Sequence, residues 1–131
     1  MRKLLLGLDI GSSSVKASLL DADTGKSIAS KAFPEEEMPI SSPQSGWAEQ
    51  DPDMWWKYVK ECIAFVQKKA EVKKGELKAI GIAYQMHGLV CVDKNQQVLR
   101  PSIIWCDSRA VAIGEKAFAD LGKDYCLPHL L

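Results

Sequence analysis

A carboxylate, a glycine, three serines and a lysine fall close together near the start of the chain, in Asp9-Ile10-Gly11-Ser12-Ser13-Ser14-Val15-Lys16. An apolar run precedes Asp9, and the alternation that starts at Val15 predicts a second strand after the turn. Backbone N–H groups and serine hydroxyls in such a turn can face phosphate oxygens, and a carboxylate at the end of the first strand can hold Mg²⁺ directly or through water. The pattern indicates either a phosphate-binding hairpin with its metal or an ordinary Gly/Ser turn.

A Walker A loop is the main competing interpretation of this segment, and it does not fit. The stretch from Gly11 to Lys16 has no second glycine before the lysine, and Ala17 follows where Walker A requires Ser or Thr. A Walker A loop also opens a helix, whereas this turn opens a strand. If the segment binds phosphate, we expect it to do so as a turn between two strands.

A second polar group follows an apolar stretch at 77–84. Gln85, Met86 and His87 come directly after this predicted strand, at the strand end where ligands collect in open α/β sheets. His87 can donate to or accept from hydroxyl groups, although a lone histidine is more often structural. The position therefore predicts a ligand contact with a structural role as the alternative.

A third group contains an aromatic and a charged pair. Trp105 offers an aromatic face to C–H surfaces of a ligand, or fills the core at the end of a strand. Asp107 can form a salt bridge with Arg109, cap the following helix or touch a ligand, and a structural role is the first expectation for it.

Hydrophobic periodicity predicts the elements that must position these residues. They are, in order, strands at 3–9, 15–22 and 27–33, a polar loop at 34–50, a helix capped by Asp51 and running to Ala70, a strand at 77–84 buried on both faces, a hairpin of 89–93 with 98–105, and a helix over 108–121 closed by Gly122. Pro101 lowers the regularity of the second hairpin arm or places it at a sheet edge.

Composition excludes several classes of function. The chain has 131 residues, enough for one domain, and 17 basic residues balance 17 acidic ones, so we expect neither nucleic acid nor an anionic membrane as a partner. No segment is long enough to span a membrane, and Asp9 interrupts the apolar start, so a signal peptide does not fit. The four cysteines lack zinc-like spacing and predict reduced, mostly buried thiols in a cytoplasmic protein.

Four segments together resemble the N-terminal part of the FGGY family of carbohydrate kinases, and within it the xylulokinase branch. They are Asp9 to Lys16, Gly46-Trp47-Ala48-Glu49-Gln50-Asp51-Pro52, Gln85-Met86-His87-Gly88 and Trp105-Cys106-Asp107-Ser108-Arg109. The resemblance implies an α/β fold, namely the ribonuclease-H-like β-β-β-α-β unit of the actin/hexokinase superfamily, with an inserted hairpin and an incomplete C-terminus. Residues 1–131 would form the N-terminal part of the first lobe, with the second lobe absent from the chain.

The resemblance also implies ligands and roles. ATP would bind at Gly11, Ser12, Ser13, Ser14 and Lys16, with Asp9 supporting Mg²⁺. The sugar would contact Gln85, Met86, His87, Trp105 and Asp107, while Trp47 and Glu49 would belong to a loop that closes beside it. The implied reaction is the phosphorylation of a ketopentose, D-xylulose to D-xylulose 5-phosphate, by an enzyme for which a homodimer is one option.

Alternatives remain open at this point. Another FGGY kinase would act on ribulose, gluconate, fuculose or glycerol, although the glycerol branch typically carries Arg-Glu where this chain has Met86-His87. A non-catalytic ribonuclease-H-like module would bind sugar or nucleotide only. In the family the catalytic base lies beyond the equivalent of Leu131, so we expect a fragment that is inactive alone and whose apolar ending at 125–131 promotes self-association.

Overall fold

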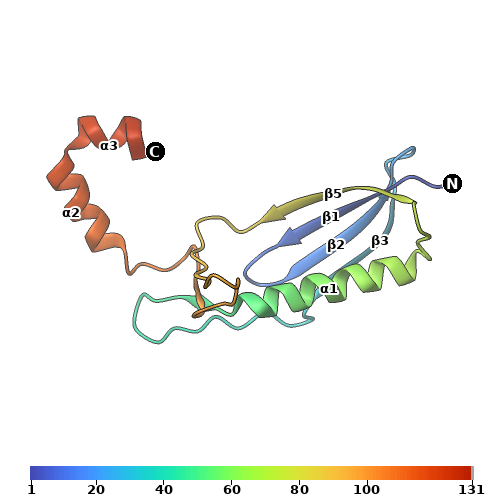
Figure 1. Ribbon diagram of the computed structural model, residues 1–131, viewed down its shortest axis with the longest axis horizontal. Helices are drawn as coiled ribbons and strands as arrows, with labels where there is room; N and C mark the ends of the chain where they lie inside the picture. Colours follow the sequence, from blue (N-terminus) through green and yellow to red (C-terminus); the bar gives the residue numbers. More distant parts are fainter. Residues whose placement is uncertain (131) are drawn as a thin grey trace.

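A mixed four-stranded sheet forms one end of the molecule, where the N-terminus also lies (Figure 1). The computed structural model describes residues 1–130. The strand order is β3-β2-β1-β5, formed by β1 (Leu4–Ile10), β2 (Val15–Asp21), β3 (Ser27–Phe33) and β5 (Leu77–Tyr84). Because β1 runs antiparallel to β2 and parallel to β5, the β1–β2 turn and the C-terminal end of β5 lie at the same edge of the sheet. The four strands and the β-β-β-α-β order predicted from the sequence are confirmed.

Helix α1 (Pro52–Lys69) covers one face of this sheet, over β2 and β3. Asp51 is the N-cap, as predicted: its side chain accepts a hydrogen bond from the N–H of Asp53 at 2.9 Å, and Pro52 is the first helical residue. The core between helix and sheet consists mainly of alternate residues of two strands and one stripe of the helix, namely Leu4, Leu6, Leu8, Val15, Ala17, Leu19, Val59, Cys62 and Val66. Each large aliphatic side chain buried there contributes about 1.5–3 kcal/mol.

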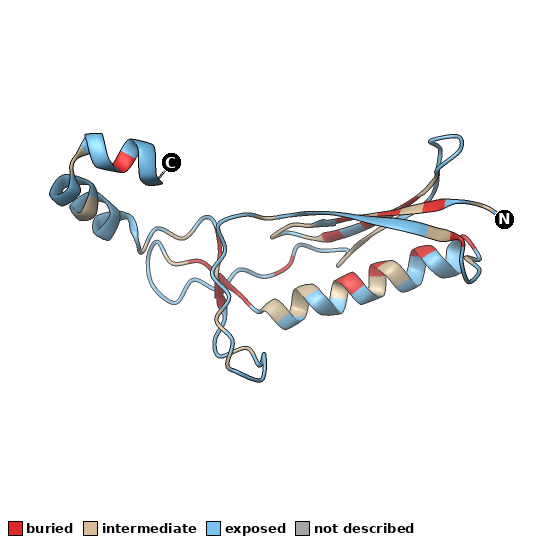
Figure 2. Cartoon of the chain, turned by 45° about the horizontal axis from the view of Figure 1, so that its top comes forward, coloured by how far each residue is buried: buried red, intermediate tan, exposed pale blue. Residues whose placement is uncertain are grey.

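Strand β5 is exposed, so the prediction that it is buried on both faces is wrong for this chain. Ile80 and Ile82 are 56% and 59% exposed. They pair with Leu6 and Leu8 of β1 and so share the face that α1 covers, but α1 lies over β2 and β3 and leaves β5 open (Figure 2). The apolar run correctly indicated a strand and did not indicate what covers it.

Two short strands join loops at the end of the sheet. β4 (Glu49–Gln50) pairs antiparallel with β6 (Ser102–Ile103). The predicted hairpin of 89–93 and 98–105 is confirmed only in part. Its two arms share two isolated antiparallel bridges, Val92 with Val98 and Leu89 with Ile103, but within residues 1–130 they form no regular strand pair, and Ser102–Ile103 of the second arm also pairs with β4. The predicted polar loop 34–50 ends in a strand because its partner comes from far along the chain, where no local pattern can indicate it.

Two helices extend away from the sheet at the end of the chain (Figure 1). α2 (Val111–Leu121) begins later than the predicted 108, and Gly122 ends it with φ 83° and ψ 154°, a conformation open essentially to glycine alone. The sequence predicts no helix for the apolar ending, yet α3 (Lys123–Leu130) forms there. Tyr125 is 51% exposed, whereas Leu131 lies outside the described residues, so self-association through this ending stays a prediction.

The cysteines follow the prediction only in part. Within residues 1–130 all four are free, but Cys62 and Cys126 are buried, Cys91 is half-buried and Cys106 is exposed. Among the described helices, none is both long and apolar enough to cross a membrane.

Candidate functional site

The turn between β1 and β2 is closed tightly on itself. The N–H of Gly11 donates to the carbonyl of Ser14 at 3.0 Å, and a Cβ at Gly11 would lie 3.2 Å from that oxygen, so glycine suits the closure. Among the described residues, nothing accepts a hydrogen bond from the N–H groups of Ser12, Ser13 and Ser14. Three available amides and three hydroxyls in one turn are the donor set that phosphate binding requires.

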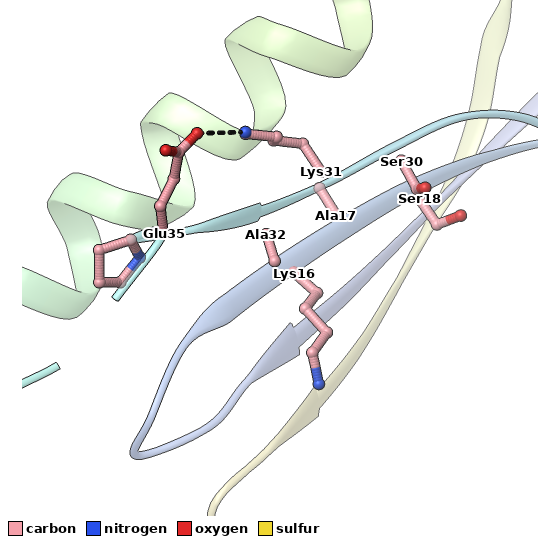
Figure 3. Close-up of a pocket in the computed structure, with 8 residues that line it drawn as sticks. Lys16, Ala17, Ser18, Ser30, Lys31, Ala32 and Glu35 are labelled. Carbon is pink, nitrogen blue, oxygen red and sulfur yellow. Dashed lines mark hydrogen bonds and ion pairs between the residues drawn. The ribbon is translucent and has the colours of Figure 1, made fainter. Parts of the chain in front are cut away.

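Asp9 and Lys16 stand opposite each other on the strands that flank this turn. Lys16 Nζ lies 3.4 Å from Asp9 Oδ2, and the side chains are 60% and 54% exposed. Figure 3 shows Lys16 pointing away from α1, over an open depression of about 630 Å³ that Ser18 and Ser30 also line. Both charged groups therefore remain accessible beside the turn.

This arrangement offers Mg²⁺ the carboxylate of Asp9, so water and phosphate would supply its other ligands. Within residues 1–130 no group of three His, Cys, Asp or Glu side chains could hold a metal. A single carboxylate suits Mg²⁺, which keeps several waters and takes further ligands from substrate phosphates. Asp9 beside the serine turn fits that donor set, and Lys16 could neutralise phosphate charge.

Gln85, Met86 and His87 lie at the same edge of the sheet, where β5 ends. The N–H of Gln85 donates to the carbonyl of Ile10 at 2.9 Å, which ties this segment to the end of β1. Met86 is 64% exposed, and His87 has φ 62°, a left-handed conformation that is uncommon outside glycine and marks a constrained turn. Gln85, His87, Trp55 and neighbouring residues line a cavity of about 300 Å³.

The side-chain amide of Gln85 is a polar group without a partner. Its Nε2 and Oε1 are both buried, and neither forms a hydrogen bond with any of residues 1–130. Leaving such a group unpaired costs about 1–3 kcal/mol, so a water or a ligand hydroxyl in the cavity would relieve it. This observation agrees with the predicted ligand role of Gln85 without testing it.

Trp105 connects the third predicted group to the serine turn. Its indole Nε1 lies 3.4 Å from the Oγ of Ser12, and its side chain is 58% exposed. The alternative that Trp105 fills the core is therefore wrong in this structure. An exposed aromatic face next to the turn remains free to contact a ligand.

Residues 46–50 and 105–109 form two facing loops, here called the loop clamp. Arg109 binds Asp107 through two hydrogen bonds, Nη2 to Oδ2 at 2.7 Å and Nε to Oδ1 at 2.9 Å, and it also donates to Glu49 at 2.7 Å. Asp107 accepts from the N–H of Ala48 at 2.6 Å, and Ser108 donates to the carbonyl of Gly46 at 2.9 Å. Charge-assisted bonds of this kind are about twice as strong as neutral ones, so they join the two loops firmly.

The electrostatics of the loop clamp keep Asp107 ionised. The Arg109 guanidinium beside it, helped by the N–H of Ala48, holds the pKa of the Asp107 carboxyl well below its usual range. The salt bridge to Arg109 predicted for Asp107 is confirmed, whereas the predicted helix cap is wrong, because α2 begins at Val111 with Ala110 as its N-cap and no side-chain cap bond. The Asp107 side chain is 2% exposed with both oxygens engaged, so a direct sugar contact stays a prediction.

Sequence reasoning missed several residues that hold the site. Arg100 forms a salt bridge with Glu49, and the Arg109 guanidinium carbon lies 3.7 Å from the centre of the Trp47 ring. Gln50, only 2% exposed, reaches the serine turn. The motif from Gly46 to Pro52 contains Trp47, Glu49 and Gln50, so its polar residues were a signal, but their partners lie too far along the chain to be inferred.

The fold and this edge of the sheet define the class of protein first. A β-β-β-α-β sheet, with a serine turn after β1 and the segment Gln85 to His87 after the parallel β5, is the ribonuclease-H-like fold of the actin/hexokinase superfamily. The chain belongs to the FGGY family of carbohydrate kinases: residues 4–128 match the N-terminal domain of that family.

Individual relatives agree with this assignment. The chain is 37% identical over 106 residues to the xylulose kinase of Escherichia coli strain K12, covering 81% of this chain and 21% of the relative. The solved gluconate kinase of Lactobacillus acidophilus superposes with a TM-score of 0.80 at 30% identity, covering 92% of this chain and 23% of the other. The xylulose kinase of Rhodospirillum rubrum gives 0.79 at 27% identity, covering 93% and 24%. The chain thus spans about a quarter or less of the length of these relatives.

Proposed function

We propose that this chain is the N-terminal part of the first lobe of an ATP-dependent sugar kinase whose substrate is a ketopentose, D-xylulose, with D-xylulose 5-phosphate as product. The contact between Trp105 and Ser12 carries the proposal, because it brings a residue predicted to meet the sugar against the turn predicted to meet phosphate. Phosphoryl transfer needs these two groups side by side. The chain's identity to xylulose kinases supports the choice of sugar.

Different residues would bind the two substrates, and the serine turn with Asp9 and Lys16 would bind MgATP. Amides and hydroxyls of Ser12, Ser13 and Ser14 would cradle the ATP phosphates, and Asp9 would hold Mg²⁺ through its waters. Bound MgATP supplies the phosphoryl group and screens its charge. Lys16 would stabilise the charge that develops on the transferred group.

The sugar side uses the segment after β5. Met86 and His87 would contact the ketose, with hydrogen bonds from His87 and Gln85 to its hydroxyls and the Trp105 face against its carbon chain. The base that accepts the sugar proton is expected outside these 131 residues. We therefore expect no kinase activity from the chain alone, and a homodimeric, cytoplasmic whole enzyme stays a prediction.

The test uses the enzyme encoded by the whole coding region. Coupled ADP-release assays would compare D-xylulose, ribulose, gluconate and glycerol, and D-xylulose should give the highest kcat/KM. His87→Ala should raise the KM for the ketose by about tenfold or more, as for loss of a hydrogen bond to substrate, and leave the KM for ATP nearly unchanged. His129→Ala, at the chain's other histidine, is the matched control and should change neither constant.

One observation favours a second candidate. The superposition on a gluconate kinase is as close as that on a xylulose kinase, with TM-scores of 0.80 and 0.79. A higher kcat/KM for gluconate than for D-xylulose would select that alternative.

Equal effects of His87→Ala on the KM for the ketose and the KM for ATP would show that His87 is not part of the sugar site.

A further inference from the structure

Gln50 is buried in β4 and uses its whole side-chain amide to join three segments. Its Nε2 donates to the carbonyl of Ser12 at 2.7 Å and to that of Pro39 at 3.2 Å. Its Oε1 accepts from the indole Nε1 of Trp55 at 3.1 Å. The residue is 2% exposed, so these bonds are shielded from competing water. One amide thus links the serine turn, the loop before β4 and the start of α1.

A second carbonyl of the serine turn is also held from outside. The N–H of Met38 donates to the carbonyl of Ser13 at 2.8 Å, and the Met38 side chain is buried at 3% exposure. The carbonyls of Ser12 and Ser13 are therefore both occupied by the rest of the chain. The N–H groups of Ser13 and Ser14 have no acceptor among the described residues.

Peptide geometry connects these two facts. In a planar trans peptide the C=O and the N–H of the same unit point in opposite directions. Because the Ser12 carbonyl points toward Gln50, the Ser13 N–H of the same peptide points away from Gln50. Likewise, the Ser13 carbonyl points toward the N–H of Met38, so the Ser14 N–H points away from Met38. Two successive amides are presented outward, as an anion-binding turn requires.

We propose that Gln50 is a positioning residue of the phosphate site: it fixes the peptide between Ser12 and Ser13 so that the Ser13 N–H faces the ATP phosphates. Gln50 does not itself touch phosphate. The inference rests on the proposed function, because it assumes that phosphate binds at the serine turn. Gln50 and the preceding residue, Glu49, both belong to the loop clamp, so the hydrogen bonds of Gln50 connect the clamp to the serine turn.

The test compares the 131-residue chain with Gln50→Met, which keeps the length of the side chain and removes all its hydrogen bonds. Ser102→Ala is the matched control, because Ser102 is also buried and lies opposite Gln50 in the β4–β6 pair, while its hydroxyl bonds to the carbonyl of Ile103 and not to the serine turn. Gln50→Glu is the second variant: it keeps the acceptor for Trp55 and loses only the two donors. Circular dichroism shows which variants are folded.

Two measurements distinguish the backbone order of the serine turn from its affinity for MgATP. Without ligand, ¹⁵N relaxation of the Ser12, Ser13 and Ser14 amides should give order parameters near about 0.85 in the unmodified chain and below about 0.6 in Gln50→Met. Titration with MgATP, followed by the same amide resonances, should show affinity falling by about fivefold or more, as for the loss of one hydrogen bond. Ser102→Ala should match the unmodified chain in both.

The outcomes distinguish this inference from the proposed function. Unchanged order and unchanged MgATP affinity in both Gln50 variants, beside a responding unmodified chain, would overturn the role of Gln50 alone. If MgATP moves none of the serine-turn amides in the unmodified chain, the phosphate site itself is wrong and the inference falls with it. Loss of order and affinity in both Gln50 variants but not in Ser102→Ala would support it.

Discussion

Two halves of the same sheet face behave in opposite ways. Leu6 and Leu8 of β1 are 2% and 7% exposed, whereas their neighbours in the ladder, Ile80 and Ile82 of β5, are 56% and 59% exposed. The side chains are similar and point to the same side of the sheet. The difference lies in what covers them, because α1 crosses β2 and β3 and stops short of β5.

The loops at the end of the sheet show the same contrast. In the loop clamp, Asp107 is 2% exposed at its side chain and bound by Arg109 and a backbone amide. In α2 no residue is buried, and α2 and α3 pack chiefly against each other. Buried side chains are therefore concentrated under α1 and in the clamp, next to the candidate site. Strand β5 is held chiefly by its ladder with β1, and α2 and α3 bury few side chains within the described residues.

The largest difference should come from matched deletions in the two halves of the sheet. Leu19 is completely buried, so Leu19→Ala should lower the free energy of unfolding by about 3 kcal/mol through lost burial and a cavity. Ile82→Ala, on exposed β5, should cost less than about 1 kcal/mol. Urea unfolding measures both, and equal losses would show that β5 is covered in solution.

The next largest effect concerns the loop clamp. Arg109→Met leaves the Asp107 carboxylate without its salt-bridge partner. It also removes one of the two arginines that pair with Glu49, the other being Arg100. The melting temperature should therefore fall by about 5–10 °C. Lys116→Met removes an exposed salt bridge to Asp120 in α2 and is the matched control, with an expected change of about 1 °C or less. Similar shifts for both substitutions would contradict the assignment of the clamp as the more stable region.

Acid should lower the free energy of unfolding in a defined pH range, through Glu76, the residue just before β5. Hydrogen bonds from Arg2 and from the N–H of Lys73 lower the pKa of Glu76 from 4.5 to about 2. The Glu76 carboxyl binds a proton more tightly in the unfolded state than in the folded state. Its contribution to the free energy of unfolding is therefore complete above about pH 4.5 and is lost as the pH falls toward 2. Asp107, whose pKa is also lowered by its partner Arg109, acts in the same direction.

Thermal unfolding at several pH values checks this prediction. Glu76→Gln should lower the melting temperature at pH 7 and make it less dependent on pH below 4.5, because the proton that links folding to pH is gone. Glu37→Gln, an exposed residue in the loop before β4, should leave the curve unchanged. A Glu76→Gln curve parallel to that of the unmodified chain would contradict the assignment.

The smallest effect should follow removal of residues 111–131. Since α2 and α3 make few contacts with the sheet, a chain ending at Ala110 should melt within about 2 °C of the whole chain. Differential scanning calorimetry measures the change. A larger loss would show that the two helices stabilise the body, and the contrast drawn here would then be wrong.

Local pattern determined much of this protein. The apolar run of β1, the alternation in β2, the turn at Gly11 to Ser14 and the cap at Asp51 were all predictable, because each depends on residues close together in the sequence. The spacing of apolar residues likewise predicted α1 and its buried stripe. The candidate ligand residues after β5 were found because they follow a strand end.

Only the tertiary structure decided which of these elements meet. The β4–β6 pair, the exposure of β5 and the bond from Gln50 to Ser12 all join segments that are distant in the sequence. Asp107 illustrates the reason: its type suited a helix cap, yet Arg109 and the N–H of Ala48 hold it in the loop clamp. A residue type states which bonds a side chain can form, while the packing of distant segments selects the partner that excludes water and lowers the free energy most.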